Sequence, residues 1–203
     1  MLASTDLVDR HPFELRERQF AAGPSAPRLE SLAMTDETDK AEDTETEILD
    51  RPGVRLVRAA LRAAGIPDEV RVLPSSAPTA AAAAEQLGCQ VGAIANSLVF
   101  EADGAPLLVL TSGAHRVETR ALAERIGVGS IRRASADFVR AATGQAIGGV
   151  APLGHRVPLR TLVDEALAGH EVVWAAAGHH RTVFPTGFRQ LVAATGGAVV
   201  AVD

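Results

Sequence analysis

Residues 94–111 read IANSLVFEADGAPLLVLT, and this stretch is the strongest indication of the fold class. Residues 94–100 and 106–111 are both apolar and have the composition that is typical of strands. Residues 101–105, which connect them, have the length of a hairpin link and contain Asp103-Gly104, a pair that favours a tight turn. The stretch therefore predicts a β-hairpin made of two antiparallel strands.

Helical and strand patterns alternate on both sides of this hairpin. Residues 52–65 have helical spacing with Pro at the start and Gly past the end, and Thr79 can cap an alanine-rich helix that ends at Gly88. Residues 159–167 are expected to begin as strand and end as helix. Further helices are predicted at residues 116–126, 136–143 and 186–195, and further strands at residues 69–73, 130–132, 171–177 and 198–202. The predicted fold class is α+β, with helices and strands mixed along the chain.

The charge pattern divides the chain near residue 51. Residues 1–50 hold 13 acidic and 5 basic side chains, a net charge of −8, whereas residues 51–203 hold 12 acidic and 15 basic ones, a net charge of +3. An acidic stretch with little apolar periodicity cannot bury enough surface to offset the entropy cost of ordering it. We therefore predict a disordered acidic tail over residues 1–50, with Met34 as an alternative start of translation, and one folded domain over residues 51–203.

The composition argues against several kinds of site. Aromatic residues make up only 3% of the chain and tyrosine is absent, so binding of single-stranded nucleic acid by base stacking is not expected. Cys89 is the lone cysteine, which excludes an internal disulfide and a cysteine-based zinc site. No apolar run approaches the roughly 20 residues that span a bilayer. We expect a cytoplasmic protein whose partners include neither membrane nor DNA.

Common catalytic and metal-binding motifs do not occur. The sequence has no Gly-x-Ser-x-Gly elbow, and a phosphate loop that needs Gly-Lys is excluded because Lys40 is the only lysine. No two histidines have the i, i+4 spacing of a helical metal site. The histidines of the predicted domain are His115, His155, His170, His179 and His180. We predict no metal and no organic cofactor, and we interpret His179 and His180 as a polar tip after the strand at residues 171–177.

Four segments occur in an order and spacing that resemble a known family. They are AIANSLVF at residues 93–100, TSGAHRV at residues 111–117, TGQAIGGVAPLGH at residues 143–155 and AAG at residues 176–178. As a set they are similar to the YbaK family, which includes free-standing aminoacyl-tRNA deacylases and the editing domain inserted in many bacterial prolyl-tRNA synthetases. The resemblance extends from residue 54 to the end of the sequence.

The resemblance implies a fold, an activity and partners. The implied fold is a strongly curved mixed sheet flanked by helices, with a pocket between the sheet and a glycine-rich loop. The implied activity is hydrolysis of the ester that joins a noncognate amino acid to tRNA, a trans-editing deacylase reaction that needs no cofactor. The implied partner is the 3′ end of a mischarged aminoacyl-tRNA, and an aminoacyl-tRNA synthetase is a further candidate partner.

The implied catalytic residues are two loop glycines and one strand residue. The family places the scissile ester on the loop that here contains Gly148 and Gly149, whose backbone can approach a ligand closely and direct N–H groups at it. The alternative is that this loop is only a tight turn at a corner of the sheet. The family's pocket lysine corresponds to Asn96, whose neutral amide can still orient a carbonyl. The alternative is that Asn96 lines the pocket without a catalytic part.

Other residues of the matching segments are expected around the substrate. Ser112 and Gly113 are implied to face the pocket, or else Ser112 caps the following helix. His115 and Arg116 are expected to meet a tRNA phosphate or, alternatively, to lie in solvent. His155 follows the loop closely enough for proton transfer to a bound ester. The remaining expected substrate-binding residues are Ser97, Gly144, Val150, Pro152, Gly154 and Gly178.

Two other functions stay open beside the deacylase. The domain has no lysine that could replace the one missing at Asn96. A catalytically silent member of the family, which binds an aminoacyl-tRNA end, a nucleotide or a protein partner, is therefore one alternative. A Ser or His hydrolase of small metabolites is the other, and it requires Ser112 or His155 for turnover.

Overall fold

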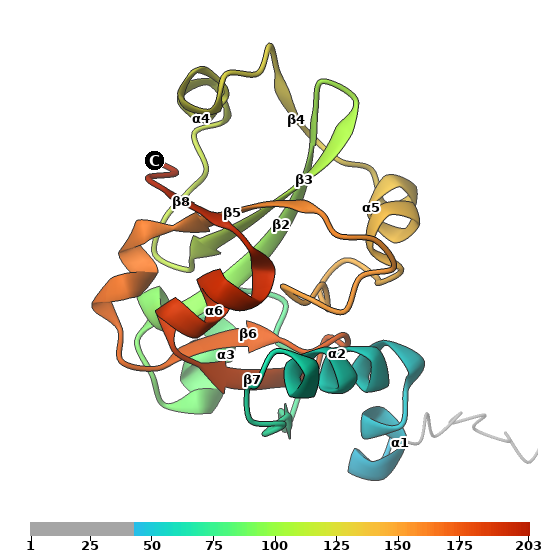
Figure 1. The fold of residues 1–203 in the computed structure, drawn as a ribbon. Coiled ribbons are helices and arrows are strands. Elements are labelled where there is room, and N and C mark those ends of the chain that lie inside the picture. The colour runs from blue at the N-terminus through green and yellow to red at the C-terminus, as the bar shows by residue number, and fades with distance from the viewer. Residues whose placement is uncertain (1–42) are drawn as a thin grey trace, which may run out of the picture. The chain divides into compact units, whose positions relative to one another are not determined.

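The predicted hairpin lies at the centre of the sheet, where β2 (Ile94–Ala102) pairs antiparallel with β3 (Ala105–Ser112) from Ala95 onward (Figure 1). The structure is a computed structural model, and it describes residues 43–203. The connection is shorter than predicted, because Asp103 and Gly104 alone join the strands. Both residues have positive φ, as a two-residue turn with the twist of a hairpin requires.

The hairpin is part of an eight-stranded mixed sheet with the strand order β1-β7-β6-β2-β3-β5-β8, to which β4 is added through β2. β2 and β6 pair in parallel, and so do β3 with β5 and β5 with β8. The other strands are β1 (Arg71–Val72), β4 (Ile131–Arg133), β5 (Arg160–Asp164), β6 (Val173–Ala176), β7 (Thr182–Thr186) and β8 (Ala198–Val200). This sheet and its flanking helices confirm the predicted fold class.

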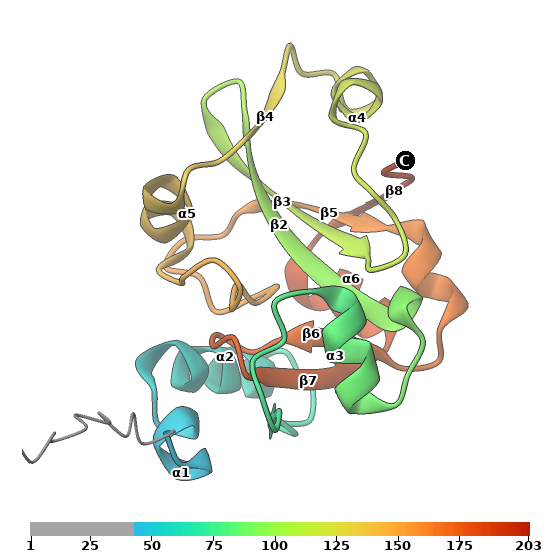
Figure 2. The same cartoon turned by 180° about the vertical axis from the view of Figure 1, so that it is seen from behind.

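The sheet forks along one edge of β2. Ile94 and Ala95 pair with β6, whereas residues 100–102 pair with β4, and the two partner strands leave in different directions (Figure 2). Within residues 43–203, residues 96–99 pair with a strand on the β3 side only. The fork therefore leaves backbone groups of β2 without a strand partner, and a ligand can bond to them there.

The helices pack against the sheet through three apolar clusters. Val57 and Leu61 of α2, Val139 of α5 and Leu191 of α6 share the largest cluster. α4 belongs to a second cluster and α3 to a third. The helices are α1 (Glu45–Leu49), α2 (Pro52–Ala63), α3 (Ala80–Leu87), α4 (Thr119–Ile126), α5 (Ala136–Thr143) and α6 (Phe188–Thr195). In the described part of the chain, none of the helices has the length and apolarity needed to cross a membrane.

Residues 43–50 are ordered, which differs from the predicted tail. Thr44 and Glu47 form a reciprocal capping box at the start of α1, and Ile48 of this helix is fully buried. Burial of one isoleucine stabilises such a segment by about 1.5–3 kcal/mol. The prediction of disorder rests on the high acidic content of the segment and leaves this burial out. The folded domain therefore begins before residue 51. The rest of the predicted tail, including Met34, lies outside the described residues.

Residues 182–186 form β7, a strand that the sequence pattern does not predict. Pro185 lies in this strand, and a proline argues against a central strand because it cannot donate to the ladder. β1 is so short that it pairs only with Thr182 and Val183, so Pro185 faces no strand on that side. The strand displaces the start of the predicted helix, and α6 begins at Phe188 rather than at Thr186.

Candidate functional site

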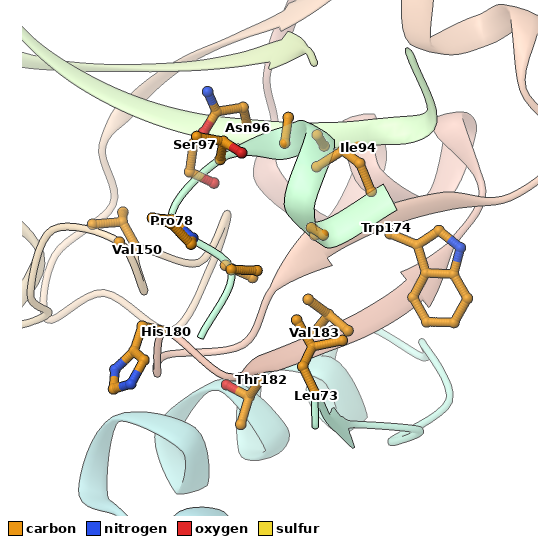
Figure 3. A pocket seen from close by; sticks show the side chains of 18 of the residues that line it. Leu73, Pro78, Ile94, Asn96, Ser97, Val150, Trp174, His180, Thr182 and Val183 are labelled. Atoms are coloured by element: carbon orange, nitrogen blue, oxygen red, sulfur yellow. The ribbon is translucent and has the colours of Figure 1, made fainter. Parts of the chain in front are cut away.

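A hollow of about 260 Å³ lies where β2 and β6 part, and we call it the first hollow. Its wall is formed by β2, β6, the turn between β6 and β7, the start of α3 and the loop at residues 147–150. Trp174 and Ile94 lie at one end, and Val150 and His180 lie at the other (Figure 3). Most of the lining is apolar, and the polar groups gather near the loop, a combination that is typical of a small-molecule site.

Four of the predicted site residues line the first hollow. Asn96 and Ser97 reach it from β2, and Gly148 and Val150 reach it from the loop on the other side. The structure thus brings the glycine-rich loop and Asn96 to the same cavity. These two segments are about fifty residues apart in the sequence, and only the sheet topology places them together.

Ser97 is the more enclosed of the two strand residues. Side chains alternate along a strand, and Ala95 and Val99, on the same face as Ser97, pack into the cluster that contains Val150. The Oγ atom of Ser97 is buried and has no hydrogen-bond partner in the described chain. A buried hydroxyl without a partner costs about 1–3 kcal/mol, so a ligand that supplied the bond would be favoured here. Asn96, by contrast, is exposed at the rim.

The two glycines of the loop, Gly148 and Gly149, differ in their hydrogen bonds and in their contacts. Gly148 has a φ of +89°, which favours glycine, and its N–H has no acceptor within residues 43–203. The N–H of Gly149 donates to the carbonyl of Ala146 over 3.1 Å and is therefore not free for a ligand. A Cβ on Gly149 would lie 2.9 Å from the Cα of His179, so this glycine lets the loop approach the β6–β7 turn. The expected pair of amide donors is thus reduced to Gly148.

The β6–β7 turn adds two residues that the sequence analysis did not assign to the site. His179 and His180 both line the first hollow, with their ring centroids 4.0 Å apart. Burial lowers the pKa of His179, and the neighbouring His180 lowers it further. The Nδ1 atom of His179 accepts the N–H of Arg181 over 3.3 Å, as a neutral ring can. No spacing in the sequence marks these histidines. The approach of Gly149 to His179 and of Gly148 to His180 places them beside the loop.

Ser112 and Gly113 lie behind the wall of the hollow. The hydroxyl of Ser112 donates to the carbonyl of Gly92 over 2.9 Å. It caps no helix, because α4 begins only at Thr119. A Cβ on Gly113 would lie 2.6 Å from the Cβ of Ala80, which does line the hollow. Both residues therefore support the site from outside.

His115, Arg116 and His155 are also absent from the lining of the first hollow. The Nδ1 atom of His115 lies 3.1 Å from a carboxylate oxygen of the fully buried Asp164, and Arg116 is exposed. The Nε2 atom of His155 is 2.8 Å from the carbonyl oxygen of Ala151. This contact holds the ring at the end of the loop, outside the lining of the hollow, and burial lowers the pKa of His155 there.

The remaining predicted residues maintain the backbone around the loop. A Cβ on Gly154 would lie 3.1 Å from the Cα of Val57, and a Cβ on Gly178 would lie 2.6 Å from the carbonyl of Gly53, so both glycines let α2 approach. Gly144 ends α5 with a φ of +73°, and Pro152 is buried after the loop. None of these four residues lines the first hollow.

The aminoacyl-tRNA editing domain family matches residues 74–193. The chain belongs to this family. The matched residues include every residue that lines the first hollow except Leu73. The resemblance to the YbaK family of editing domains is therefore confirmed.

Three solved structures are similar to this editing domain. A candidate trans-editing enzyme for prolyl-tRNA synthetase is 39% identical, with a TM-score of 0.70, and the match covers 75% of this chain and 98% of that one. A structure from a study of epitope grafting onto scaffold proteins is 37% identical, with a TM-score of 0.70 and coverage of 75% and 97%. A hypothetical protein is 27% identical, with a TM-score of 0.67 and coverage of 72% and 98%. Among curated proteins no match was found.

Proposed function

We propose that this editing domain hydrolyses the ester between a small amino acid and the 3′-terminal ribose of a mischarged tRNA. Two hydrogen-bond donors without partners lie close to the fork of the sheet, and this observation carries the proposal. Ser97 and Gly148 both line one cavity, and neither the hydroxyl of Ser97 nor the N–H of Gly148 has a partner in the described chain. Membership of the editing family supports aminoacyl-tRNA as the substrate class.

The reaction begins when a water molecule attacks the carbonyl carbon of the ester and the carbonyl π electrons move to oxygen. The N–H of Gly148 and the hydroxyl of Ser97 donate to this oxyanion, and such donors are worth most where charge develops. The bond to the ribose oxygen then breaks, that oxygen takes up a proton, and free amino acid and tRNA are released. Asn96, at the rim, donates its amide to the carbonyl and orients it before the attack.

Proton transfer needs a base close to the loop. His180 lines the same cavity, and its Cβ lies 3.9 Å from the position that a Cβ on Gly148 would take. A neutral imidazole can accept the proton of the attacking water and return it to the ribose oxygen. The α-amine of the substrate is the other available base, and an activated ester needs few protein groups when it is well positioned.

The apolar end of the first hollow supports a small apolar amino acid as the hydrolysed group. This end is walled by Ile94, Trp174 and Ala83, and the lining of the whole hollow contains no Asp, Glu, Lys or Arg. A charged side chain bound there would lose its hydration without a counter-charge, which is costly. One methylene changes binding in such a pocket by only about 1–3 kcal/mol, so several small amino acids compete.

A panel of mischarged tRNAs tests the proposal directly. Release of amino acid is measured under single-turnover conditions for the wild type and for Asn96→Ala, Asn96→Asp and Asn96→Lys. Loss of one neutral hydrogen bond costs about 0.5–1.5 kcal/mol, so Asn96→Ala should be up to about tenfold slower. Asn96→Asp keeps the shape of the side chain but removes its N–H donors and should be at least as slow. Asn96→Lys should be active and faster.

A catalytically silent member of the family is the second candidate, and the exposed position of Asn96 favours it. In that case the wild type, Asn96→Ala and Asn96→Asp are all inactive on every tRNA of the panel. Activity that arises only in Asn96→Lys identifies the silent binder and overturns the proposed hydrolysis.

A further inference from the structure

A second hollow of about 260 Å³ lies on the β4 side of the fork. It shares Ser97, Leu98, Ile147, Gly148 and Val150 with the first hollow. The residues that it adds are Val99, Phe100, Arg133, Ala134 and Val139. The two hollows therefore adjoin along the five shared residues, which we call the shared wall. They include Ser97, whose hydroxyl is unpaired, and Gly148, whose N–H is free, in the described chain.

The two hollows differ in charge. Arg133 lines the second hollow, is exposed, and has no ion pair or side-chain hydrogen bond to any residue in the range 43–203. The neighbouring Arg132 has a counter-charge, because its Nη2 atom lies 2.9 Å from the Oε1 atom of Glu101. Arg133 is thus a cation without a counter-charge at a cavity whose other lining residues are uncharged. Such an arginine is suited to a phosphate, which it can bind with two parallel hydrogen bonds.

The charges also decide which end of an aminoacyl ester enters which hollow. The α-ammonium group of the amino acid is a cation, and Arg133 would repel it from the second hollow. The lining of the first hollow contains no arginine or lysine, so this repulsion is absent there. The α-ammonium group keeps its hydration at the exposed rim beside Asn96, and the apolar side chain fills the apolar end. With the ester at the shared wall, the nucleoside part of the substrate then extends into the second hollow, between β4 and the loop.

We infer that the second hollow binds the terminal nucleoside of the tRNA and that Arg133 binds the phosphate on its 5′ side. This inference rests on the proposed function. The lining of the second hollow is apolar apart from Ser97 and Arg133, which suits a base. The unpaired edge of β2 at residues 96–99 offers backbone donors and acceptors to the rim of that base. Arg133 is in this view a substrate-positioning residue of the editing site.

The inference is tested with two minimal substrates, 3′-O-alanyl-adenosine with and without a 5′-phosphate. The wild type should hydrolyse the phosphorylated ester with a kcat/KM about ten- to hundredfold higher, as expected for one charge-assisted contact. Arg133→Ala should lose this preference, and Arg133→Lys should restore part of it. Arg132→Ala is the matched control, because it removes the adjacent arginine of the same strand and should keep the preference.

Other outcomes separate this inference from the proposed function. If the wild type hydrolyses both esters at equal rates, or if Arg132→Ala loses the preference in place of Arg133→Ala, Arg133 does not bind the phosphate. If neither ester nor any mischarged tRNA is hydrolysed, the proposed hydrolysis fails. The second hollow is then tested alone by calorimetry with adenosine 5′-monophosphate and adenosine. Tighter binding of the monophosphate that Arg133→Ala abolishes supports the subsite, and equal binding of both ligands overturns it.

Discussion

Gly149 passes so close to His179 that a Cβ on the glycine would lie 2.9 Å from the Cα of the histidine. No side chain fits at that separation, so the loop and the β6–β7 turn can meet only because residue 149 is glycine. Gly148 and His180 adjoin this contact and both line the first hollow. The contact therefore fixes the distance between the free amide of the loop and the candidate base.

Replacing Gly149 with alanine should separate these two groups. We expect Gly149→Ala to lower the free energy of unfolding by about 1–3 kcal/mol, as overpacking does, and to slow deacylation at least tenfold because the site loses its geometry. Chemical denaturation and single-turnover hydrolysis measure the two effects. Gly196→Ala is the control, because Gly196 has open space around its Cβ position, although unlike Gly149 it has positive φ. It should lose about 1–2 kcal/mol of stability at an unchanged rate. A normal rate in Gly149→Ala would contradict this role.

Ser97→Ala should have opposite effects on stability and on activity. The substitution removes a buried hydroxyl that has no partner, so the melting temperature should stay the same or rise. Loss of a donor to the oxyanion should slow hydrolysis by about a hundredfold. Ser112→Ala is the control, since this hydroxyl donates to Gly92. It should lower stability by about 1 kcal/mol without a change in rate. A destabilised Ser97→Ala variant with full activity would show that the hydroxyl is structural.

Most of the fold could be predicted from local signals. The Asp103-Gly104 pair identified the central hairpin, and Thr79 and Gly88 marked both ends of α3 correctly. The signals failed where tertiary contacts overrode local pattern. One buried isoleucine, Ile48, orders the acidic segment at α1, and the shortness of β1 makes Pro185 tolerable in β7.

The site was predictable in part, because the resemblance identified the loop and the strand that meet at the fork. It could not separate residues that line the cavity from residues that shape it. Gly148 and Gly149 look equivalent in the sequence. The structure distinguishes them, because the N–H of Gly149 donates to the carbonyl of Ala146 and is not available to a ligand. His179 and His180 carry no motif, so their place beside the loop emerges from three-dimensional packing alone.

Stability should fall as the pH drops below the ordinary pKa of histidine. Burial lowers the pKa of both His155 and His179 in the folded protein. Below about pH 6.5 the unfolded chain therefore binds protons that the folded chain does not, and the free energy of unfolding decreases until the lowered pKa values are passed. Urea denaturation at about pH 7.5 and about pH 5.5 measures this loss.

His155→Gln should reduce the acid-induced loss of stability. The glutamine amide can still donate to the carbonyl of Ala151, which His155 Nε2 contacts in the wild type, but it does not titrate. The difference between the two pH values should therefore be smaller in this variant than in the wild type. Ser112→Ala, which weakens the fold without removing a titrating group, should keep the full difference. An identical pH dependence in His155→Gln and the wild type would exclude His155 as a source of the effect.

The size of the first hollow should decide which amino acids are hydrolysed. Ala83 of α3 is buried and lines the apolar end of the hollow, whereas Ala82 of the same helix does not line it. Ala83→Val adds two methyl groups to the wall and should slow hydrolysis of the larger aminoacyl esters about ten- to hundredfold more than that of the smallest. Ala82→Val costs the same helix propensity, about 0.6 kcal/mol, and should leave the order of preference unchanged. Rates measured across a series of glycyl-, alanyl- and valyl-tRNA give the comparison. Equal slowing of all three esters by Ala83→Val would mean that the amino acid side chain binds outside the first hollow.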